Sequence, residues 1–469
     1  MARCFCRWRN MLICVCTPCM TVMLFFVYIT VALYTNLSAS MRDLESTVHH
    51  LLQQQIHFVA PGTIKNESFA PLPKTFWDLQ PHGNAIWNQL QIAIDRSINP
   101  ILHPNRRRFI KNRDDELLMN KISLFTNSVI VNDSDNLPQQ IRRFLTHMHR
   151  RDYPILIHPS GMCGVGSNKD KGRPLLLFAI KTTVDDFKNR HAIRNTWAKV
   201  GWVAGQRRNS STGRKGGAYI RRVFLLGKQN TQKMGVDHSE LLQMENDHHG
   251  DILQWDFEDT FFNLTLKDVL FWSWFSSFCK GTHFVFKGDD DVFVNTPAMI
   301  DYLHSQLTKP NTTDTMRDFM VGDVINAAMP IRENNSKYFI PESFYKGVFP
   351  SYAGGGGVVY SGLLAKRLHH VSKRVHLFPI DDVYVGMCVL RLNASPIVHP
   401  AFLTFDFQKG EKLHKCTYHT ILLVRKRNPA EILKLWAYMK KRQQQCWHVR
   451  LRDKETARYQ RLHHTADFI

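Results

Sequence analysis

The 469-residue sequence has no charged residue between Met11 and Tyr34, and these 24 positions are enough to cross a bilayer with some tilt. The run also lacks a clear small-x-small cleavage site, which favours an uncleaved signal-anchor over a cleaved signal peptide. Arg3, Arg7 and Arg9 precede it. The positive-inside rule therefore places residues 1–10 in the cytoplasm and everything after residues 11–34 in the lumen.

Zinc-type cysteine spacing is absent as well, because the five cysteines beyond the apolar run stand far apart. In an oxidising lumen, five cysteines allow up to two disulfides and one leftover thiol. The odd count, and the strand–helix block that each pair would flank, predict bonds between Cys163 and Cys279 and between Cys388 and Cys416. Cys446 would then be free or intermolecular.

Acidic residues are scarce: 40 Asp and Glu stand against 61 Lys and Arg, which gives a net charge of +21. No nucleic-acid motif accompanies this charge, and a luminal domain never meets nucleic acid, so we expect no nucleic-acid partner. A basic surface instead favours anionic ligands or membranes.

Residues 35–80 are polar and broken by prolines, which predicts a stem. A luminal domain would span residues 81–446, and a basic tail, residues 447–469, follows it. Asn-x-Ser/Thr triplets support a secretory route, although Asn36 lies too close to the membrane for modification. The expected glycosylation sites are Asn66, Asn132, Asn209, Asn263, Asn311, Asn334 and Asn393.

Apolar strand candidates alternate with helical stretches in the middle of the chain. We expect strands at Leu175–Ile180, Arg222–Leu226, Asp251–Trp255 and Thr282–Phe286, and helices at Ile86–Ile98, Pro138–His149, Asp185–Trp197, Ser239–Asp247 and Phe262–Phe278. This alternation predicts an α/β layer structure with a mainly parallel sheet flanked by helices. Ligands in such sheets bind beyond the carboxyl ends of the strands.

The segment Phe284–Asn295 (FVFKGDDDVFVN) places three aspartates between two apolar blocks. In extended backbone Asp289 and Asp291 share a face while Asp290 points away. Two carboxylates on one face suit Mn²⁺ or Mg²⁺ carrying a diphosphate, whereas the alternative is a solvated acidic turn. The closing Glu of a helix–loop–helix calcium site is missing.

Three further motifs contain candidate functional residues. Arg190 and Arg194 lie on one face of a helix, where they could grip a diphosphate or be tied to acidic neighbours. The run Gly354–Gly357 permits close backbone approach to a ligand or forms a mobile loop. Asp381 and Asp382 begin a helix, either as caps or as a general base for a sugar hydroxyl.

In combination, RHAIRNTW, FVFKGDDDVFVN, YAGGGGVVYSG and PIDDVYVGMC resemble the β-1,3-glycosyltransferases of the galactosyltransferase family, in the family's order. Trp87-Asn88, Asn99–Leu102, the DTFFNLTLKDVLF segment from Asp259 and Ile380-Asp381-Asp382 are most similar to the β-1,3-N-acetylglucosaminyltransferases that extend poly-N-acetyllactosamine. The resemblance covers about residues 85–446, of which residues 81–170 form a family-specific N-terminal part.

This resemblance implies a GT-A fold, a UDP-sugar donor, Mn²⁺ or Mg²⁺, a galactose-terminated glycan acceptor and inversion at the anomeric carbon. Asp382 would be the catalytic base, and Asp291 and His399 would hold the metal. The donor side would comprise Lys181, Arg190, Arg194, Asp289, Asp290 and Asp291. The acceptor side would comprise Tyr352, Gly355, Gly356 and Asp381.

Two departures from the family accompany the resemblance: a cysteine pair carried by similar members around residues 122–153 is missing, and the tail after Cys446 is unmatched. We expect a single-pass type II enzyme of the Golgi membrane that transfers N-acetylglucosamine. The alternatives are a β-1,3-galactosyltransferase that uses UDP-galactose and a catalytically inactive sugar-binding relative. Association as a homodimer, or with other glycosyltransferases, is left open.

Overall fold

The computed structural model describes residues 24–32, 84–98, 137–159, 162–163, 173–208, 215–229, 237–310, 312–407 and 415–453. The chain divides into two units, Met1–Ile56 and His57–Ile469. In the first unit residues 24–32 are helical. Among the described residues, no helix has the length and apolar character needed to span a bilayer. The predicted tail, most of the apolar run and the predicted stem lie outside them.

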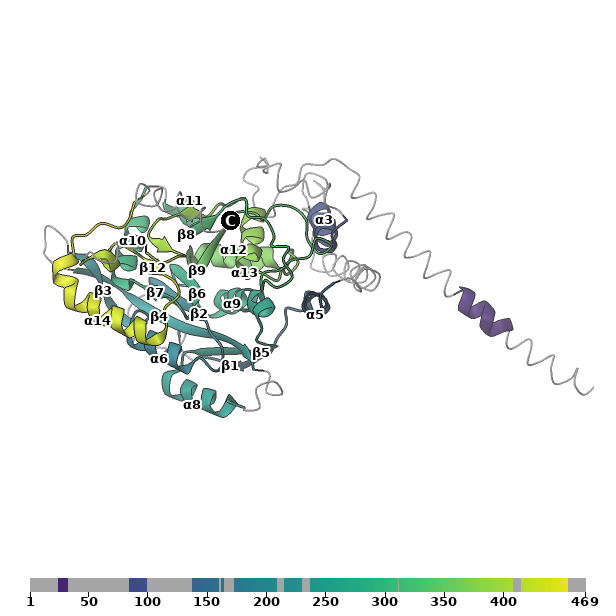
Figure 1. Cartoon of the computed structure of the whole chain (residues 1–469), viewed down its shortest axis with the longest axis horizontal. Helices are drawn as coiled ribbons and strands as arrows, with labels where there is room; N and C mark the ends of the chain where they lie inside the picture. Colours follow the sequence, from purple (N-terminus) through teal and green to yellow (C-terminus); the bar gives the residue numbers. More distant parts are fainter. Residues whose placement is uncertain are drawn as a thin grey trace, which may run out of the picture. The chain divides into compact units, whose positions relative to one another are not determined.

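The second unit is built on one large mixed sheet (Figure 1). Its strands follow the order β1-β5-β4-β2-β6-β9-β8-β10, with β3 paired to β4. Their bounds are β1 Ile155–Ile157, β2 Leu176–Lys181, β3 Gly201–Arg208, β4 Lys215–Lys228, β5 Ile252–Glu258, β6 Phe284–Asp289, β8 Met320–Ile325, β9 Tyr352–Ser361 and β10 Ile397–Val398. A small second sheet has the order β11-β12-β7, formed by β11 Phe402–Leu403, β12 Leu423–Val424 and β7 Phe293–Val294.

Helices flank the large sheet, and several begin at recognisable caps. The side chain of Asn295 accepts a hydrogen bond from the Ala298 amide at the start of α10, and Asn428 and Glu431 form a capping box on α14. The helices are α3 Ile86–Ile98, α5 Gln139–His147, α6 Phe187–Asn195, α8 Ser239–His249, α9 Leu264–Phe278, α10 Thr296–Leu307, α11 Thr312–Arg317, α12 Gly362–Ser372, α13 Asp381–Arg391 and α14 Pro429–Cys446.

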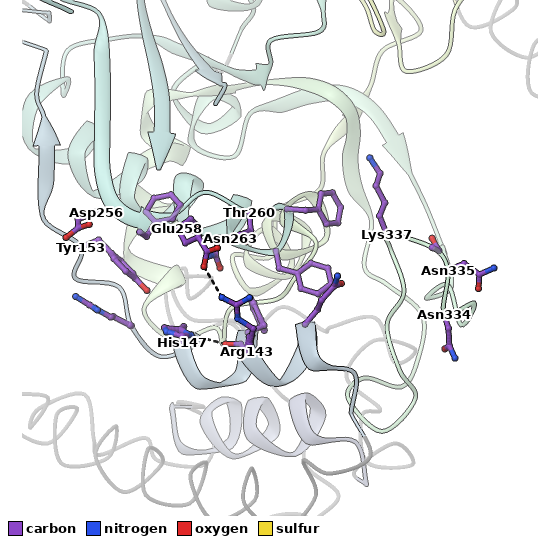
Figure 2. A pocket seen from close by; sticks show the side chains of 17 residues that line it. Arg143, His147, Tyr153, Asp256, Glu258, Thr260, Asn263, Asn334, Asn335 and Lys337 are labelled. Atoms are coloured by element: carbon purple, nitrogen blue, oxygen red, sulfur yellow. Dashed lines mark hydrogen bonds and ion pairs between the residues drawn. The ribbon is translucent and has the colours of Figure 1, made fainter. Parts of the chain in front are cut away.

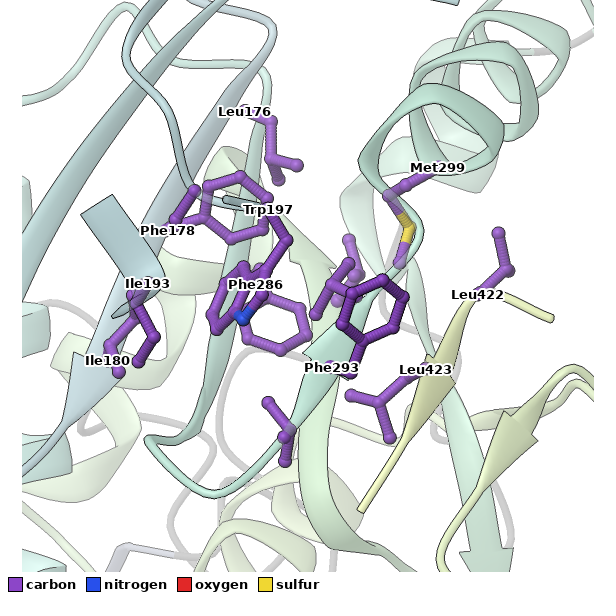
Figure 3. Close-up of a cluster of buried hydrophobic side chains, with 14 of the residues drawn as sticks. Leu176, Phe178, Ile180, Ile193, Trp197, Phe286, Phe293, Met299, Leu422 and Leu423 are labelled. Atoms are coloured by element: carbon purple, nitrogen blue, oxygen red, sulfur yellow. The ribbon is translucent and has the colours of Figure 1, made fainter. Parts of the chain in front are cut away.

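The hydrophobic core lies where β2 and β6 run side by side (Figure 3). Every residue of β2 is buried, and its apolar run Leu176–Ile180 is typical of a central parallel strand. The rings of Phe178, Trp197 and Phe286 contact one another edge to face, with centroids 5.2–5.9 Å apart. This packing fixes the carboxyl ends of β2 and β6, from which the site is built.

The predicted parallel arrangement is confirmed for the four strands β5, β4, β2 and β6. The sheet as a whole is mixed, because β9 pairs antiparallel with both β6 and β8, and β1 and β3 are antiparallel additions. The glycine run belongs to β9 and therefore lies inside the sheet, beside β6. A strand–helix–strand pattern predicts parallel neighbours, but no helix lies in the described residues between β8 and β9, so the pattern did not predict how β9 pairs.

Of the two predicted disulfides, one is confirmed and one is wrong. Cys163 is bonded to Cys279, as predicted. Cys416 is bonded to Cys446 and not to Cys388, which stays a buried free thiol in α13. The reason is tertiary: the end of α14 returns to the segment before β12, while Cys388 is on the apolar side of its helix and has no exposed surface.

Candidate active site

The acidic loop, Asp289–Asp291, begins at the last residue of β6 and continues as a turn at Asp290 and Asp291. Asp290 accepts a 2.5 Å hydrogen bond from the Thr182 hydroxyl, on the neighbouring β2 side. Asp289 and Asp291 both point toward Arg425: a carboxylate oxygen of Asp289 lies 3.3 Å from its Nη2, and one of Asp291 lies 3.8 Å from its Nε. The prediction that these two aspartates share a face, with Asp290 turned away, is confirmed. Burial raises the pKa of Asp290 to about 7, although the Thr182 hydrogen bond opposes this shift.

Beside the loop lies a buried lysine–aspartate cluster of five residues: Lys181, Lys287, Asp268, Asp381 and Asp382. Lys181 donates to Asp268 (3.1 Å) and to Asp381, and Lys287 donates to Asp268 (3.2 Å) and to Asp382 (3.3 Å). Lys181 ends β2, Lys287 lies in β6, Asp268 lies in α9 and the other two begin α13. Four elements distant in sequence therefore meet at one group of charges.

The two neighbouring aspartates of this cluster differ in charge state. Burial alone would raise the pKa of Asp381, but the Lys181 and Lys287 ammonium groups hold it below its ordinary value. Burial and the negative charge of Asp381 raise the pKa of Asp382 to about 7, against the pull of the same lysines. The Asp382 side chain is 30 % exposed and that of Asp381 only 14 %. Asp382 is thus the carboxylate with both solvent access and proton affinity near neutral pH.

Residues of β9 line the side of Asp382. Burial raises the pKa of Tyr352 to about 12, and the nearby negative charge of Asp382 adds to this effect. A Cβ atom added at Gly354 would lie 3.7 Å from an Asp382 carboxylate oxygen, so the strand runs close to this side chain. Gly356 has φ +83°, a left-handed conformation that suits glycine, and Gly355 precedes it in the same strand. Of the predicted acceptor-side residues, Tyr352 thus lies beside Asp382, Gly356 lies beside Arg425, and Asp381 at the start of α13 is paired with Lys181.

Arg190 and Arg194 do not reach this site. Arg190 is fully buried and binds Glu245 at 2.8 Å, and Arg194 donates to Asp251 at 2.7 Å. Arg222 also binds Asp251, which completes an arginine cluster of Arg190, Arg194, Arg222, Glu245 and Asp251. The structure contradicts direct donor contact by Arg190 and Arg194, because their donors are already used on these acidic neighbours.

Two cavities adjoin at this end of the sheet and share Phe261 and Lys337. The smaller, about 300 Å³, is lined by the acidic loop, Asp381, Asp382 and Arg425. The larger, about 680 Å³, lies between α5 and the segment that leads into α9 (Figure 2). An ion pair of 3.0 Å joins Arg143 and Glu258, two of the residues that line it. Together the two cavities provide an acidic pocket beside a larger cavity with aromatic and polar walls.

Comparison with known proteins identifies the chain. A profile of the galactosyltransferase family matches residues 188–400. The mouse N-acetyllactosaminide β-1,3-N-acetylglucosaminyltransferase 2 is 40% identical over 384 residues, 80% of this chain and 89% of the relative. The human protein of that name is 39% identical over 390 residues, which are 81% of this chain and 91% of the relative. The human N-acetyllactosaminide β-1,3-N-acetylglucosaminyltransferase 4 is 40% identical over 314 residues, which are 66% of this chain and 75% of the relative. The chain belongs to the galactosyltransferase family.

The metal that membership of this family led us to expect fits poorly among the described residues. His399 packs its ring against Tyr302 and Phe402 and is not part of the cavity wall around the acidic loop. Its Nδ1 accepts a hydrogen bond from the Ala401 amide, and burial lowers its pKa to about 4. Within the part of the chain that the structure describes, no three His, Cys, Asp or Glu side chains are grouped to hold a metal. Manganese or magnesium stays a prediction.

Sequence reasoning missed several residues of this galactosyltransferase-family site: Thr182, Asp268, Lys287, Lys337 and Arg425. A lysine inside the apolar strand FVFKGD was a usable signal, since an ammonium in a buried strand requires an anionic partner. Asp268 and Arg425 gave no such signal, because each is contributed by an element whose place in the fold the sequence does not show.

Three of the predicted glycosylation sites lie among the described residues. Asn334 and Asn393 are exposed, which suits a glycan. Asn263 is partly buried and donates a hydrogen bond to the Glu258 carbonyl at 2.8 Å. Asn66, Asn132, Asn209 and Asn311 lie outside the described residues. Glycosylation stays a prediction at all seven.

Proposed function

We propose that this chain transfers N-acetylglucosamine from UDP-N-acetylglucosamine to the 3-hydroxyl of a terminal β-galactose, with inversion. The names of relatives at about 40% identity support this donor and linkage. The single structural observation that carries the proposal is Asp382, a carboxylate whose pKa is about 7 and which faces a cavity beside the acidic loop.

In this reaction Asp382 acts as the general base. It removes the proton of the acceptor 3-hydroxyl while that oxygen attacks the anomeric carbon of the donor. The bond from that carbon to the β-phosphate oxygen breaks, and UDP leaves with the electron pair. A base works best when its pKa is near the operating pH, which the buried neighbours of Asp382 provide. Lys287, 3.3 Å away, holds the carboxylate in place.

The larger cavity is suited to the part of the acceptor beyond the terminal galactose. Phe261 lies where the two cavities join, and its ring contacts Tyr338 at 5.3 Å and the Lys337 ammonium at 5.2 Å. Aromatic rings of intermediate exposure are common platforms for sugar faces because they bury apolar C–H groups and cost few rotamers. We therefore place the next sugars of a galactose-terminated glycan along Phe261.

We further propose a GT-A type of sheet and residence in the Golgi lumen behind an uncleaved anchor at residues 11–34. The uncharged run and the preceding arginines support this topology. The disulfides Cys163–Cys279 and Cys416–Cys446 support an oxidising compartment. In sealed microsomes, added protease should spare the second unit. Its digestion would contradict the proposal.

A donor screen on the full chain in detergent tests the chemistry. Galactose-terminated N-acetyllactosamine is incubated with UDP-N-acetylglucosamine or UDP-galactose, and the product linkage and anomer are determined by NMR. We expect β-1,3-linked N-acetylglucosamine and at least ten times less transfer from UDP-galactose. Preference for UDP-galactose would make the chain a galactosyltransferase in activity. Absence of any transfer with UDP still bound would make it a sugar-binding relative.

The role of Phe261 is tested by acceptor length. Phe261→Ala should raise the acceptor KM by about 3- to 10-fold for a tetrasaccharide and less for a disaccharide, with kcat nearly unchanged. An equal rise in KM for both acceptors would contradict the proposal that the sugars beyond the terminal galactose bind along Phe261.

A further inference from the structure

Arg425 is fixed beside the acidic loop by backbone pairing on both of its sides. It follows β12, which is antiparallel to β7, the strand that resumes after the loop. The Arg425 amide donates to the Leu403 carbonyl at 3.1 Å, and the Arg427 amide donates to the Asp291 carbonyl at 2.7 Å. The backbone pairing of the small sheet therefore positions the Arg425 side chain beside Asp289 and Asp291.

The guanidinium of Arg425 lies on the face that Asp289 and Asp291 share. Nη2 is 3.3 Å from an Asp289 oxygen, and Nε is 3.8 Å from Oδ1 of Asp291. Both that Nε and that Oδ1 are buried and have no hydrogen-bond partner in the protein. The Arg425 side chain is only 25 % exposed and lines the cavity. These two buried atoms thus face each other, and the exposed part of the guanidinium is what Arg425 presents to the cavity.

The glycine run provides space for the Arg425 stem. A Cβ atom at Gly356 would be 3.0 Å from Cδ of Arg425, and the φ of +83° also favours glycine there. Glycine at this position thus lets the arginine lie across β9 toward the loop.

The charges identify what Arg425 does at this position. Burial alone would lower the pKa of the guanidinium, but Asp289 and Asp291 raise it, so the group is permanently cationic. A divalent cation bound between the same two carboxylates would lie within a few ångströms of a fixed positive charge, which is strongly unfavourable in a partly buried site. His399, the third ligand expected from the sequence, is packed elsewhere.

We propose that Arg425 takes the place of a divalent cation in this chain. Its guanidinium neutralises Asp289 and Asp291 and directs its remaining N–H donors at the diphosphate of the donor, so that UDP binding and sugar transfer need no metal. Guanidinium groups bind phosphate oxygens with two parallel hydrogen bonds. As the bond to the anomeric carbon breaks, the charge that develops on the β-phosphate is stabilised by these donors and by Lys337 on the cavity wall. The inference rests on the proposed UDP-sugar donor.

UDP binding to the full chain in detergent tests this role without requiring transfer. Calorimetric titration with UDP is performed in EDTA and in Mn²⁺. We expect the two dissociation constants to agree within about threefold. Arg425→Gln should weaken UDP binding at least tenfold in EDTA, whereas the exposed neighbour Lys426→Gln, which removes the same charge, should change it less than twofold. UDP binding that is lost in EDTA and restored by Mn²⁺ would overturn the proposal.

A second variant separates a guanidinium site from a metal site. Arg425→His places an imidazole beside two carboxylates, a ligand set that Mn²⁺ accepts. Electron paramagnetic resonance of added Mn²⁺ should show no bound ion in the wild type, and a bound ion together with Mn²⁺-dependent UDP affinity in Arg425→His. Stoichiometric Mn²⁺ in the wild type would contradict the inference.

The inference and the proposed function fail in different ways. Metal-free UDP binding that depends on Arg425, without N-acetylglucosamine transfer, would retain the inference and refute the function. Transfer that requires Mn²⁺ would retain the function and refute the inference.

Discussion

The molecule contains two buried ionic clusters of nearly equal size, and they serve different purposes. The arginine cluster has three guanidinium groups for two carboxylates, Glu245 and Asp251. Burial would raise the pKa of both acids, but the arginine hydrogen bonds and charges lower it. The lysine–aspartate cluster has two ammonium groups for three carboxylates, and the pKa of Asp382 is raised.

This difference shows which cluster is suited to chemistry. Where cations are in excess, every carboxylate is held ionised and fully paired, so the group stabilises the fold and has no proton to exchange. Where carboxylates are in excess, one of them is left with a raised pKa and access to a cavity. Paired arginines in a sequence can therefore indicate a structural cluster as readily as a phosphate site.

The largest expected effect is on catalysis, at Asp382. Asp382→Asn preserves size but removes proton-accepting power, so kcat should fall by about 10²–10⁴-fold. UDP affinity, measured by calorimetry, should change little because this carboxylate faces the acceptor. Should Asp381→Asn instead give the larger loss of kcat, the base would be Asp381.

The next effect concerns stability, at the arginine cluster. Arg194→Leu leaves Asp251 and Glu245 undercompensated in a buried site and should cost about 3 kcal/mol of unfolding free energy. The matched change Arg143→Leu breaks an exposed pair and should cost less than about 1 kcal/mol. Denaturant titration measures both. If the Arg194→Leu variant folds but binds UDP much more weakly, Arg194 contributes to donor binding after all.

A third prediction is the pH dependence of kcat/KM. Because Asp382 must be ionised to accept a proton, activity should rise with pH and reach half its maximum near pH 7. Asp381→Asn removes a charge that raises the pKa of Asp382, so the midpoint should move to lower pH. Initial rates between pH 5 and 9 provide the comparison. A midpoint that Asp381→Asn leaves in place would show that the titrating group is not Asp382.

The smallest expected effect is on the pH dependence of stability. The pKa of Asp382 is higher in the folded state than in the unfolded chain, so its stabilising contribution is complete below its unfolded pKa and is lost as pH rises to about 7. Asp382→Asn avoids this loss. Its Tm relative to wild type should be higher at pH 8 than at pH 5, as calorimetry would measure. An unchanged difference would mean that Asp382 is not proton-linked to folding.

Local pattern predicted the elements that carry the site. Apolar runs located β2 and β6, helical spacing located α3 with its observed ends, and the three-aspartate run was correctly divided between two faces. These features depend on neighbours within a few residues, through side-chain alternation and the helical repeat.

Contacts between distant segments could not be derived in this way. Neither the Cys416–Cys446 bond nor the attachment of Arg194 to Asp251 follows from spacing, because each requires knowing which helix end returns to which loop. The antiparallel insertion of β9 has the same origin.

The sequence by itself determined the family, the acidic motifs and the strand–helix alternation, since each is written in consecutive residues. The tertiary structure alone decided which charges are neutralised and which are left to react. Lys181, Lys287, Asp268 and Arg425 come from four separate elements, and only their approach in the fold sets the pKa of Asp382 and the cation beside Asp289 and Asp291. Electrostatic energies depend on distance and burial in space, and the order of residues along the chain specifies neither.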